Sequence, residues 1–172
     1  MNADKSKPEP APASMDVTPE KWAQLAQGSA AYREYLTAQS VTAHAAAQAL
    51  GLGGTDFFGL NLIALAGPMT AGELATRTGL TTGAATRLID RLERSGFVRR
   101  TTDPADRRKV VVEEAPDPSG RVQAVLEPHR TRMAEVFVDY TPDQLEVLFD
   151  YFARATTALR KAAQDLGERP AG

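Results

Sequence analysis

The middle of the chain constrains the fold most, because its helix-start and helix-stop signals follow one another closely. Residues 70–73, Thr-Ala-Gly-Glu, form a capping box, in which each of the two end side chains accepts a hydrogen bond from the other residue's backbone N–H. Gly79 marks a tight turn, either Thr81 or Thr82 caps the next helix, and Gly96 ends it. The pattern predicts two short helices joined by a three-residue turn.

A two-stranded hairpin is expected directly after the second of these helices. Residues 97–100 and 109–113 are short runs rich in apolar β-formers, which favour strands. The residues between them, TTDPADRR, are of turn-forming types and predict the hairpin tip. Helix, turn, helix and hairpin in this order predict a winged helix-turn-helix. The inward face of its second helix is expected to carry Ala85, Leu88, Ile89 and Leu92.

Helices are also predicted before this module. Residues 1–14 are rich in proline, alanine and charge, so we expect a disordered tail. Thr18-Pro19-Glu20 is a helix-start signal, and the long amphipathic helix that follows is expected to end at glycines 51, 53 and 54. Thr55 is the predicted cap of another helix, which Gly67-Pro68 ends. Its apolar side chains are too dense for one stripe and predict burial on most sides: Phe57, Phe58, Leu60, Leu62, Ile63 and Leu65.

Two more helices are predicted after the hairpin. Asp117-Pro118 is a cap followed by a first-position proline, and Pro128 is expected to kink the helix that begins there. Thr141 and Gln144 form a second capping box, which starts the last helix. The expected inward face of that helix carries Leu145, Leu148, Phe149, Phe152, Leu159, Ala163 and Leu166.

These elements predict a mainly α (α+β) fold, in which a winged helix-turn-helix lobe is flanked by long helices. One lobe cannot cover the apolar faces of those helices, so we expect a homodimer. A two-fold dimer would read a pseudo-palindromic site with half-sites about 10 bp apart. The predicted divisions are a tail at 1–14, a dimerisation helix at 15–54, the DNA-binding lobe at 55–115 (recognition helix about 82–95, wing about 97–113), C-terminal dimerisation helices at 116–167 and a tail at 168–172.

Charge is distributed unevenly along the chain. Residues 70–112 contain nine basic and five acidic side chains, a net charge of +4, whereas the whole chain has a net charge of −2. A basic segment in an acidic chain favours a polyanion-binding face, although a solvated surface can give the same pattern. Together with the helix-turn-helix signals, it favours binding of double-stranded DNA.

The second helix of the module would present its outward side chains to the major groove. Gly83 has no side chain and would let the helix start approach DNA closely, while Thr82 and Thr86 could bond base edges. Arg87 is the candidate for a bidentate guanine contact. The remaining arginines of this region are expected to neutralise phosphates: Arg91, Arg94, Arg99 and Arg100.

The hairpin tip carries adjacent arginines, Arg107 and Arg108, and an arginine there could enter the narrow minor groove, where the negative potential is enhanced. Asp106 would repel DNA, so we expect it to orient Arg108 through a charge-assisted hydrogen bond. The alternative is a local turn bridge with no role in DNA binding. The predicted DNA contacts are therefore Thr82, Gly83, Thr86, Arg87, Arg91, Asp106, Arg107, Arg108 and Lys109.

Residues 69–115 resemble the MarR-type winged-helix transcriptional regulators, most clearly in GELA, TRLIDRLERSGFV and DPADRR. The resemblance implies a homodimeric, cytoplasmic DNA-binding regulator, usually a repressor, that often binds a small molecule between its dimerisation layer and its DNA-binding lobe. It implies a recognition helix from Thr82 to Ser95, a minor-groove contact by Arg108 and a brace by Asp106. The chain departs from the family after the wing, where residues 114–118 replace the usual leucine-threonine pair, so the connection to the next helix is expected to differ.

Composition narrows the remaining functions. The chain has no cysteine and two histidines, His44 and His129, without a third metal ligand at sensible spacing, so we expect no metal, no cofactor and no enzymatic activity. No apolar run or leader pattern predicts a membrane segment or export, and a cytoplasmic location is expected. An aromatic effector could bind among Trp22, Tyr32, Phe57, Phe58 and Phe137, although aromatic side chains at helical spacing are more often core.

Two other functions remain open. A winged helix can serve as a protein–protein interaction scaffold without reading DNA, although threonines and an arginine at the helix start argue against this. The chain could also bind a small molecule and retain only vestigial DNA contacts. A steep dependence of DNA affinity on salt would distinguish DNA binding from both.

Overall fold

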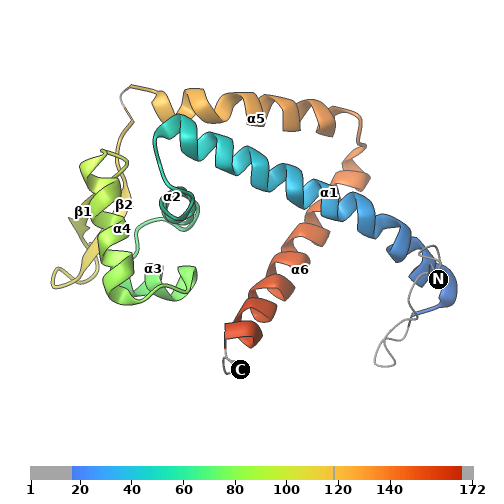
Figure 1. The fold of residues 1–172 in the computed structure, drawn as a ribbon, viewed down its shortest axis with the longest axis horizontal. Helices are drawn as coiled ribbons and strands as arrows, with labels where there is room; N and C mark the ends of the chain where they lie inside the picture. The colour runs from blue at the N-terminus through green and yellow to red at the C-terminus, as the bar shows by residue number, and fades with distance from the viewer. Residues whose placement is uncertain (1–16, 118, 168–172) are drawn as a thin grey trace, which may run out of the picture. The chain divides into compact units, whose positions relative to one another are not determined.

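The structure is a computed structural model that describes residues 17–117 and 119–167. The predicted tails at 1–14 and 168–172, and Pro118, lie outside the described residues. The chain forms two compact units, residues 1–45 and residues 46–172. The elements are α1 (Pro19–Leu50), α2 (Gly54–Ala66), α3 (Ala71–Thr78), α4 (Thr82–Arg94), β1 (Val98–Thr102), β2 (Val110–Glu114), α5 (Arg121–Val138) and α6 (Pro142–Gly167) (Figure 1).

The N-terminal unit consists of most of α1. Thr18 caps this helix as predicted, since its Oγ1 accepts a hydrogen bond from the Lys21 N–H at 3.3 Å. Apolar side chains along the helix remain exposed within the described chain, among them Leu25, Leu36 and Val41. A helix with uncovered apolar side chains is typical of one that packs against another surface.

The predicted Thr55 cap of α2 is wrong. The helix begins at Gly54, two residues before the start that a Thr55 cap implies, with Gly53 at the N-cap position and no side-chain hydrogen bond capping it. The Gly53 carbonyl instead accepts the Phe57 N–H at 2.9 Å, so the backbone completes the first turn. The predicted ends are confirmed, because Gly51 and Gly67 follow α1 and α2 with φ of +71° and +77°, values that favour glycine.

The helix-turn-helix signals are confirmed in detail. Thr70 Oγ1 accepts the Glu73 N–H at 3.2 Å, and Glu73 Oε2 accepts the Thr70 N–H at 2.7 Å. These hydrogen bonds lower the pKa of the Glu73 carboxyl below its ordinary value. Gly79 is left-handed (φ +71°), and Thr81, rather than Thr82, caps α4 by accepting the Ala84 N–H. The turn therefore holds α3 and α4 as a closely connected pair.

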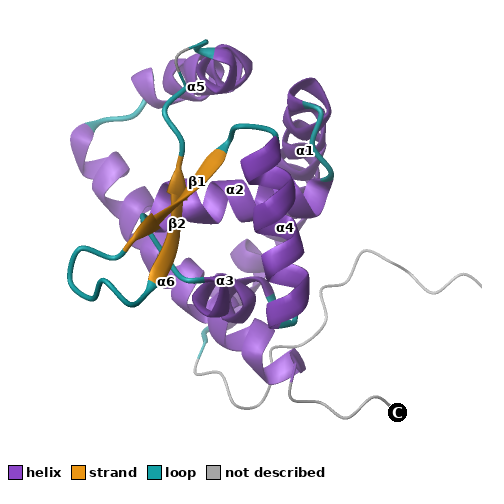
Figure 2. Cartoon of the chain, turned by 90° about the vertical axis from the view of Figure 1, so that its left-hand side faces the viewer, coloured by secondary structure: helices purple, strands orange, loops and turns teal. Residues whose placement is uncertain are grey.

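The wing is an antiparallel hairpin of β1 and β2, whose paired residues run from Val98↔Glu114 to Thr102↔Val110 (Figure 2). Each strand starts one residue later than predicted. Before β1, the Phe97 N–H still bonds to the Leu92 carbonyl of α4, and before β2 the Lys109 N–H bonds to the Asp106 carbonyl of the hairpin tip. Met69 pairs with Val112 through two backbone hydrogen bonds of 2.7 and 3.0 Å, which attaches the residue before α3 to the wing.

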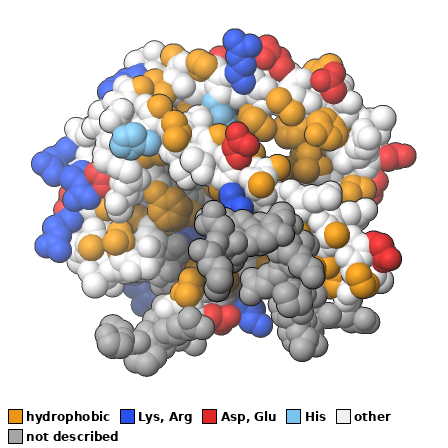
Figure 3. Space-filling model, turned by 45° about the vertical axis from the view of Figure 1, so that its right-hand side comes forward, with side chains coloured by type: hydrophobic (Ala, Val, Ile, Leu, Met, Phe, Trp, Pro, Cys, Tyr) orange, Lys and Arg blue, Asp and Glu red, His pale blue; other side chains and the backbone are white. Residues whose placement is uncertain are grey.

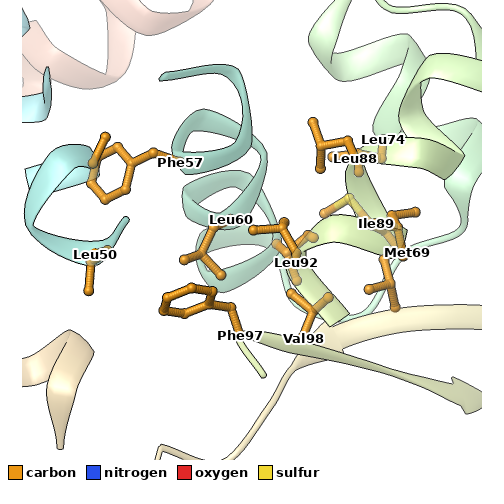
Figure 4. Packing of buried hydrophobic residues seen from close by; sticks show 13 residues of the cluster. Leu50, Phe57, Leu60, Met69, Leu74, Leu88, Ile89, Leu92, Phe97 and Val98 are labelled. Carbon is orange, nitrogen blue, oxygen red and sulfur yellow. The ribbon is translucent and has the colours of Figure 1, made fainter. Parts of the chain in front are cut away.

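One hydrophobic core unites α2, α3, α4 and the wing with the end of α1. The predicted inward residues of α4 are all buried, and Gly59 of α2 lies so close to α4 that a Cβ there would come within 2.8 Å of Leu88 Cδ2. Partly buried side chains at the start of α5, including Val122 and Leu126, pack against this core. The labelled core residues in Figure 4 are Leu50, Phe57, Leu60, Met69, Leu74, Leu88, Ile89, Leu92, Phe97 and Val98.

The connection from the wing to α5 differs from the prediction. Asp117 was expected to cap a helix starting at residue 118, but α5 begins at Arg121, after a left-handed Gly120 (φ +65°). Asp117 nevertheless accepts hydrogen bonds from the N–H groups of Arg121 and Val122, at 3.2 and 2.8 Å, and from the Ser119 hydroxyl. These bonds lower the pKa of the Asp117 carboxyl. The cap thus acts across a loop, and α5 continues as one helix through Pro128.

Several predicted inward side chains are exposed within the chain. On α2, Phe58 is 50% and Leu65 is 80% exposed, so this helix is buried on one side only. On α6, which begins with the predicted Thr141–Gln144 capping box, Phe149, Phe152, Leu159 and Leu166 are also exposed. Figure 3 shows hydrophobic side chains at the surface on the side of the chain that it presents. The predicted apolar faces are present, but the described chain does not bury them.

No single helix among the described residues is long and apolar enough to cross a membrane, although α1 and α2 together, as a bent pair, satisfy the length and composition required.

Candidate nucleic-acid interface

The N-terminal half of α4 presents small polar side chains to solvent. Thr82 and Gly83 are exposed, whereas Thr86 is half-buried and donates its hydroxyl to the Thr82 carbonyl at 2.9 Å. The opposite face of α4 is buried in the core, and this fixes the polar side chains on the solvent side of the helix. Arg87, which is exposed, completes this polar surface.

Gly83 is not required by the packing of the chain. A Cβ built at this position would meet no atom within 4 Å, and the residue lies in regular helix without a positive φ. A glycine here lowers helix stability relative to alanine without any compensating contact inside the chain. The packing of the described chain therefore does not account for a glycine at this position.

Carboxylates neutralise several arginines that were predicted to contact phosphates. Arg100 of β1 pairs with Asp90 at 2.5 Å and with Glu93, both on α4, and these partners raise its pKa, chiefly through the hydrogen bond to Asp90. Arg99 pairs with Glu113 on the neighbouring strand at 2.7 Å. The structure thus uses these arginines to attach the wing to α4 and to join its two strands.

Arg91 of α4 is paired with Asp56 of α2. Its Nε and Nη2 donate to the two carboxylate oxygens at 2.8 and 2.6 Å, a bidentate arrangement. The hydrogen bond to Asp56 raises the pKa of Arg91. Arg91 was predicted to contact DNA, and the structure places it between two helices of the lobe instead of leaving it free.

Other basic side chains of the module have no carboxylate within ion-pair distance among the described residues. This set comprises Arg77, Arg87, Arg94, Arg107 and Lys109. Arg94 donates its Nε to the Asp90 carbonyl at 3.1 Å, which leaves its charge uncompensated. The uncompensated charge of the lobe therefore lies on the two helices of the motif and on the wing.

The wing tip is ordered by two aspartates. Asp103 accepts the Ala105 N–H at 2.7 Å, and Asp106 accepts both the backbone N–H and the Nε of Arg108, at 3.1 and 3.2 Å. The hydrogen bond expected between Asp106 and Arg108 is therefore present. The Arg108 side chain is 91% exposed, so the pair directs a charged group away from the lobe.

Within residues 46–172, the aromatic residues expected around an effector do not all line one cavity. Phe57 lines a cavity of about 610 Å³ between α2 and the start of α5, together with Leu60, Leu65, Val122 and Leu126. Phe58 and Phe137 do not line it, and Phe137 instead packs edge-on against Phe149, with ring centroids 5.9 Å apart. Trp22 and Tyr32 belong to the N-terminal unit.

The polar residues around this cavity were not predicted. They are Asn61, Glu114, Asp117, Gln123 and Arg130. His44 lies in the N-terminal unit and His129 on α5, and the described residues hold no group of three or more side chains that could bind a metal ion.

The sequence did not predict two residues that join distant segments of the chain, because their partners lie far away in sequence. Asp56 lies 35 residues before Arg91. Arg121 donates to the Leu50 carbonyl, 71 residues away, at 2.6 Å, and its guanidinium lies 5.6 Å from the centre of the Phe97 ring. A lone charge at a helix start was the only sequence signal for either residue.

The order of helices, the buried face of α4 and the hairpin define a winged helix-turn-helix protein. The sequence model of the MarR family matches residues 54–110. An uncharacterized HTH-type transcriptional regulator of Bacillus subtilis, YcgE, is 39% identical over 71% of this chain and 79% of its own length. The HTH-type transcriptional repressor YetL of the same organism is 31% identical over 48% of this chain and 52% of its own.

A solved structure agrees with these matches. The transcriptional regulator BldR of Sulfolobus solfataricus is 27% identical, with a TM-score of 0.50 over 77% of this chain and 96% of its own. The chain belongs to the MarR family of transcriptional regulators. Family and relatives indicate a transcriptional regulator rather than an enzyme, and DNA binding is implied by the family.

Proposed function

We propose that this protein is a homodimer that binds specific sequences of double-stranded DNA and represses transcription in the cytoplasm. A small molecule releases it from DNA. The observation that carries the proposal is the surface of α4, where an exposed glycine and threonines precede Arg87 while the other face is fixed in the core. A helix with this surface fits the major groove, in which residues at the helix start reach base edges.

The wing supplies the second contact of the proposed interface. Arg108 is oriented by Asp106 and almost fully exposed, which suits insertion into a narrow minor groove. The exposed Arg107 and Lys109 beside it would neutralise phosphates. The proposed DNA contacts are thus Thr82, Gly83, Thr86, Arg87, Arg107, Arg108 and Lys109, with Asp106 as the brace.

Homodimerisation is supported by the uncovered apolar side chains of α1, α5 and α6. Val136 and Val138 of α5, and Val147, Leu159 and Leu166 of α6, are all at least half exposed in the described chain. Burial of apolar surface is the main favourable term in association, so helices of this composition are expected to pair with a second copy. Two lobes in a two-fold dimer would read a pseudo-palindromic operator.

The proposed effector site is the cavity between α2 and α5. Its volume of about 610 Å³ lies in the range of small-molecule sites, and it combines an apolar wall with a few polar groups. Because α2 also packs on the recognition helix α4, a ligand bound there would contact the element that positions the DNA-reading surface. Repression is supported by the relative YetL, which is an HTH-type transcriptional repressor.

The test is fluorescence anisotropy with a duplex from the region upstream of the protein's own gene and with a scrambled duplex, each at two salt concentrations. We expect tighter binding to the native duplex, with an affinity that falls steeply as salt increases. Replacing Arg108 with alanine should weaken native-duplex binding by about 1–3 kcal/mol. Absence of binding to either duplex at low salt would contradict the proposal and favour the protein–protein scaffold.

A further inference from the structure

The recognition helix is joined to α2 by a charged pair that lies beside a very close helix contact. Asp56 is 9% exposed, the buried charged residue of the described core, and both of its carboxylate oxygens accept hydrogen bonds from Arg91. A carboxylate in such a position depends on its partner, because an uncompensated buried charge is costly. Asp56 also lies in the first turn of α2, where the helix dipole favours a negative charge.

The pair continues a contact between successive turns of the two helices. Gly59 lies one turn after Asp56 on α2, and Leu88 lies one turn before Arg91 on α4. Gly59 and Leu88 approach so closely that a Cβ on the glycine would fall 2.8 Å from Leu88 Cδ2. The apolar contact sets the separation of the helices, and the ion pair fixes one helix against rotation relative to the other.

The geometry of Arg91 leaves little of it for DNA. One edge of the planar guanidinium, formed by Nε and Nη2, is used by the carboxylate of Asp56. A planar group held at two points fixes an orientation that a single point charge would not. Arg91 therefore has the geometry of an internal clamp, although its side chain is 46% exposed.

We propose that Asp56 is a positioning residue for DNA reading, which sets the orientation of the recognition helix through Arg91, and that Arg91 is not a phosphate ligand. The inference rests on the proposed DNA binding. It distinguishes Arg91, which orients the recognition helix, from the other arginines that were predicted to contact DNA.

The test compares Asp56→Asn and Arg91→Lys with the wild type in anisotropy titrations over a range of salt concentrations. Arg91→Lys keeps the positive charge, which suffices for a phosphate contact, but loses the bidentate geometry. Asp139→Asn is the matched control for charge, because Asp139 is an exposed carboxylate of the same unit, outside the proposed sites and without an ion pair among the described residues. Arg107→Ala is the reference for loss of a phosphate contact.

A positioning role predicts that Asp56→Asn and Arg91→Lys each weaken DNA binding by about 2- to 30-fold. The slope of log affinity against log salt concentration should stay unchanged. The double variant should bind DNA no more weakly than the more weakened single variant. Arg107→Ala should instead lower the salt slope by about one. Unchanged affinity in Arg91→Lys, together with an Asp56→Asn variant that binds as tightly as Asp139→Asn, would overturn the inference.

Absence of DNA binding by the wild type would contradict the proposed function but would not test the role of Asp56. Hydrogen exchange of the free protein tests that role without DNA. Loss of the clamp predicts faster amide exchange across residues 82–94 in Asp56→Asn than in wild type, with α5 unchanged. Equal exchange of α4 in the two proteins would overturn the positioning role whatever the outcome with DNA.

Discussion

The basic side chains of the lobe fall into those held in ion pairs and those without a carboxylate partner, and a count of basic residues does not distinguish the two. Arg91, Arg99 and Arg100 each hold two elements together through a carboxylate. Arg87 and Arg107 have no such partner among the described residues, and both are proposed DNA contacts. The nine basic side chains between residues 70 and 112 therefore overstate the number of cations that are free to bind phosphates.

Gly83→Ala should separate DNA binding from stability. Alanine favours a helix by up to about 1 kcal/mol relative to glycine, and the added Cβ meets no atom of the chain, so the free energy of unfolding should rise. DNA affinity should fall, because the methyl group occupies the space through which the helix start approaches the duplex. Urea unfolding and anisotropy on the same samples measure the two effects, and an unchanged DNA affinity would remove Gly83 from the interface.

At the scale of single elements, sequence predicted what short-range bonds determine. Thr18, Thr70 and Thr141 cap their helices because each needs only a backbone N–H three residues ahead. Thr55 failed as a cap because the backbone of Gly53 already closes the first turn of α2. Asp117 bonds the start of α5 across a loop, which no local spacing rule describes.

Contacts between distant elements could not be predicted in the same way. The pairing of Asp56 with Arg91 depends on the separation and rotation of α2 and α4, which the chain fixes only after the core has packed. The outward residues of α4 were nevertheless correct, because a buried stripe of four apolar side chains determines the opposite face. The outward surface of α4 thus follows from periodicity, whereas the Asp56–Arg91 pair follows from tertiary packing.

Arg121 is expected to stabilise the junction of α1, the wing and α5. Arg121→Ala removes its hydrogen bond to the Leu50 carbonyl and its contact with the Phe97 ring, so we expect the free energy of unfolding to fall by about 1–3 kcal/mol. Arg121→Lys should lose less, since lysine can still donate to the carbonyl. Urea unfolding measures both, and equal stability of wild type and the alanine variant would show that the junction does not depend on this residue.

For the whole molecule, the uncovered apolar side chains of the long helices are the principal feature. Apolar residues of α6 that were expected to be inward are exposed in the described chain, which is what a monomeric view of a dimerisation layer would give. Sequence periodicity identified these faces and led to the expectation of a homodimer, but it could not say which of their residues a second copy would cover.

Leu159→Glu tests this interpretation. Leu159 is 58% exposed, so a charge there should leave the fold of the chain intact while weakening a dimer that buries it. Thr157→Glu is the control, because it adds the same charge two residues away, on roughly the opposite side of α6. Sedimentation equilibrium should show dissociation of the Leu159 variant at concentrations where wild type and control remain dimeric. Identical association of all three proteins would exclude this face from the interface.

Selection of binding sites from a pool of randomised duplexes tests the central claim most directly, since the operator sequence does not have to be known in advance. The account predicts enrichment of a pseudo-palindrome with half-sites about 10 bp apart, bound by two copies of the chain. Failure to enrich any sequence, or enrichment of a single unsymmetrical site bound by one copy, would contradict a homodimer that reads DNA through α4 and the wing.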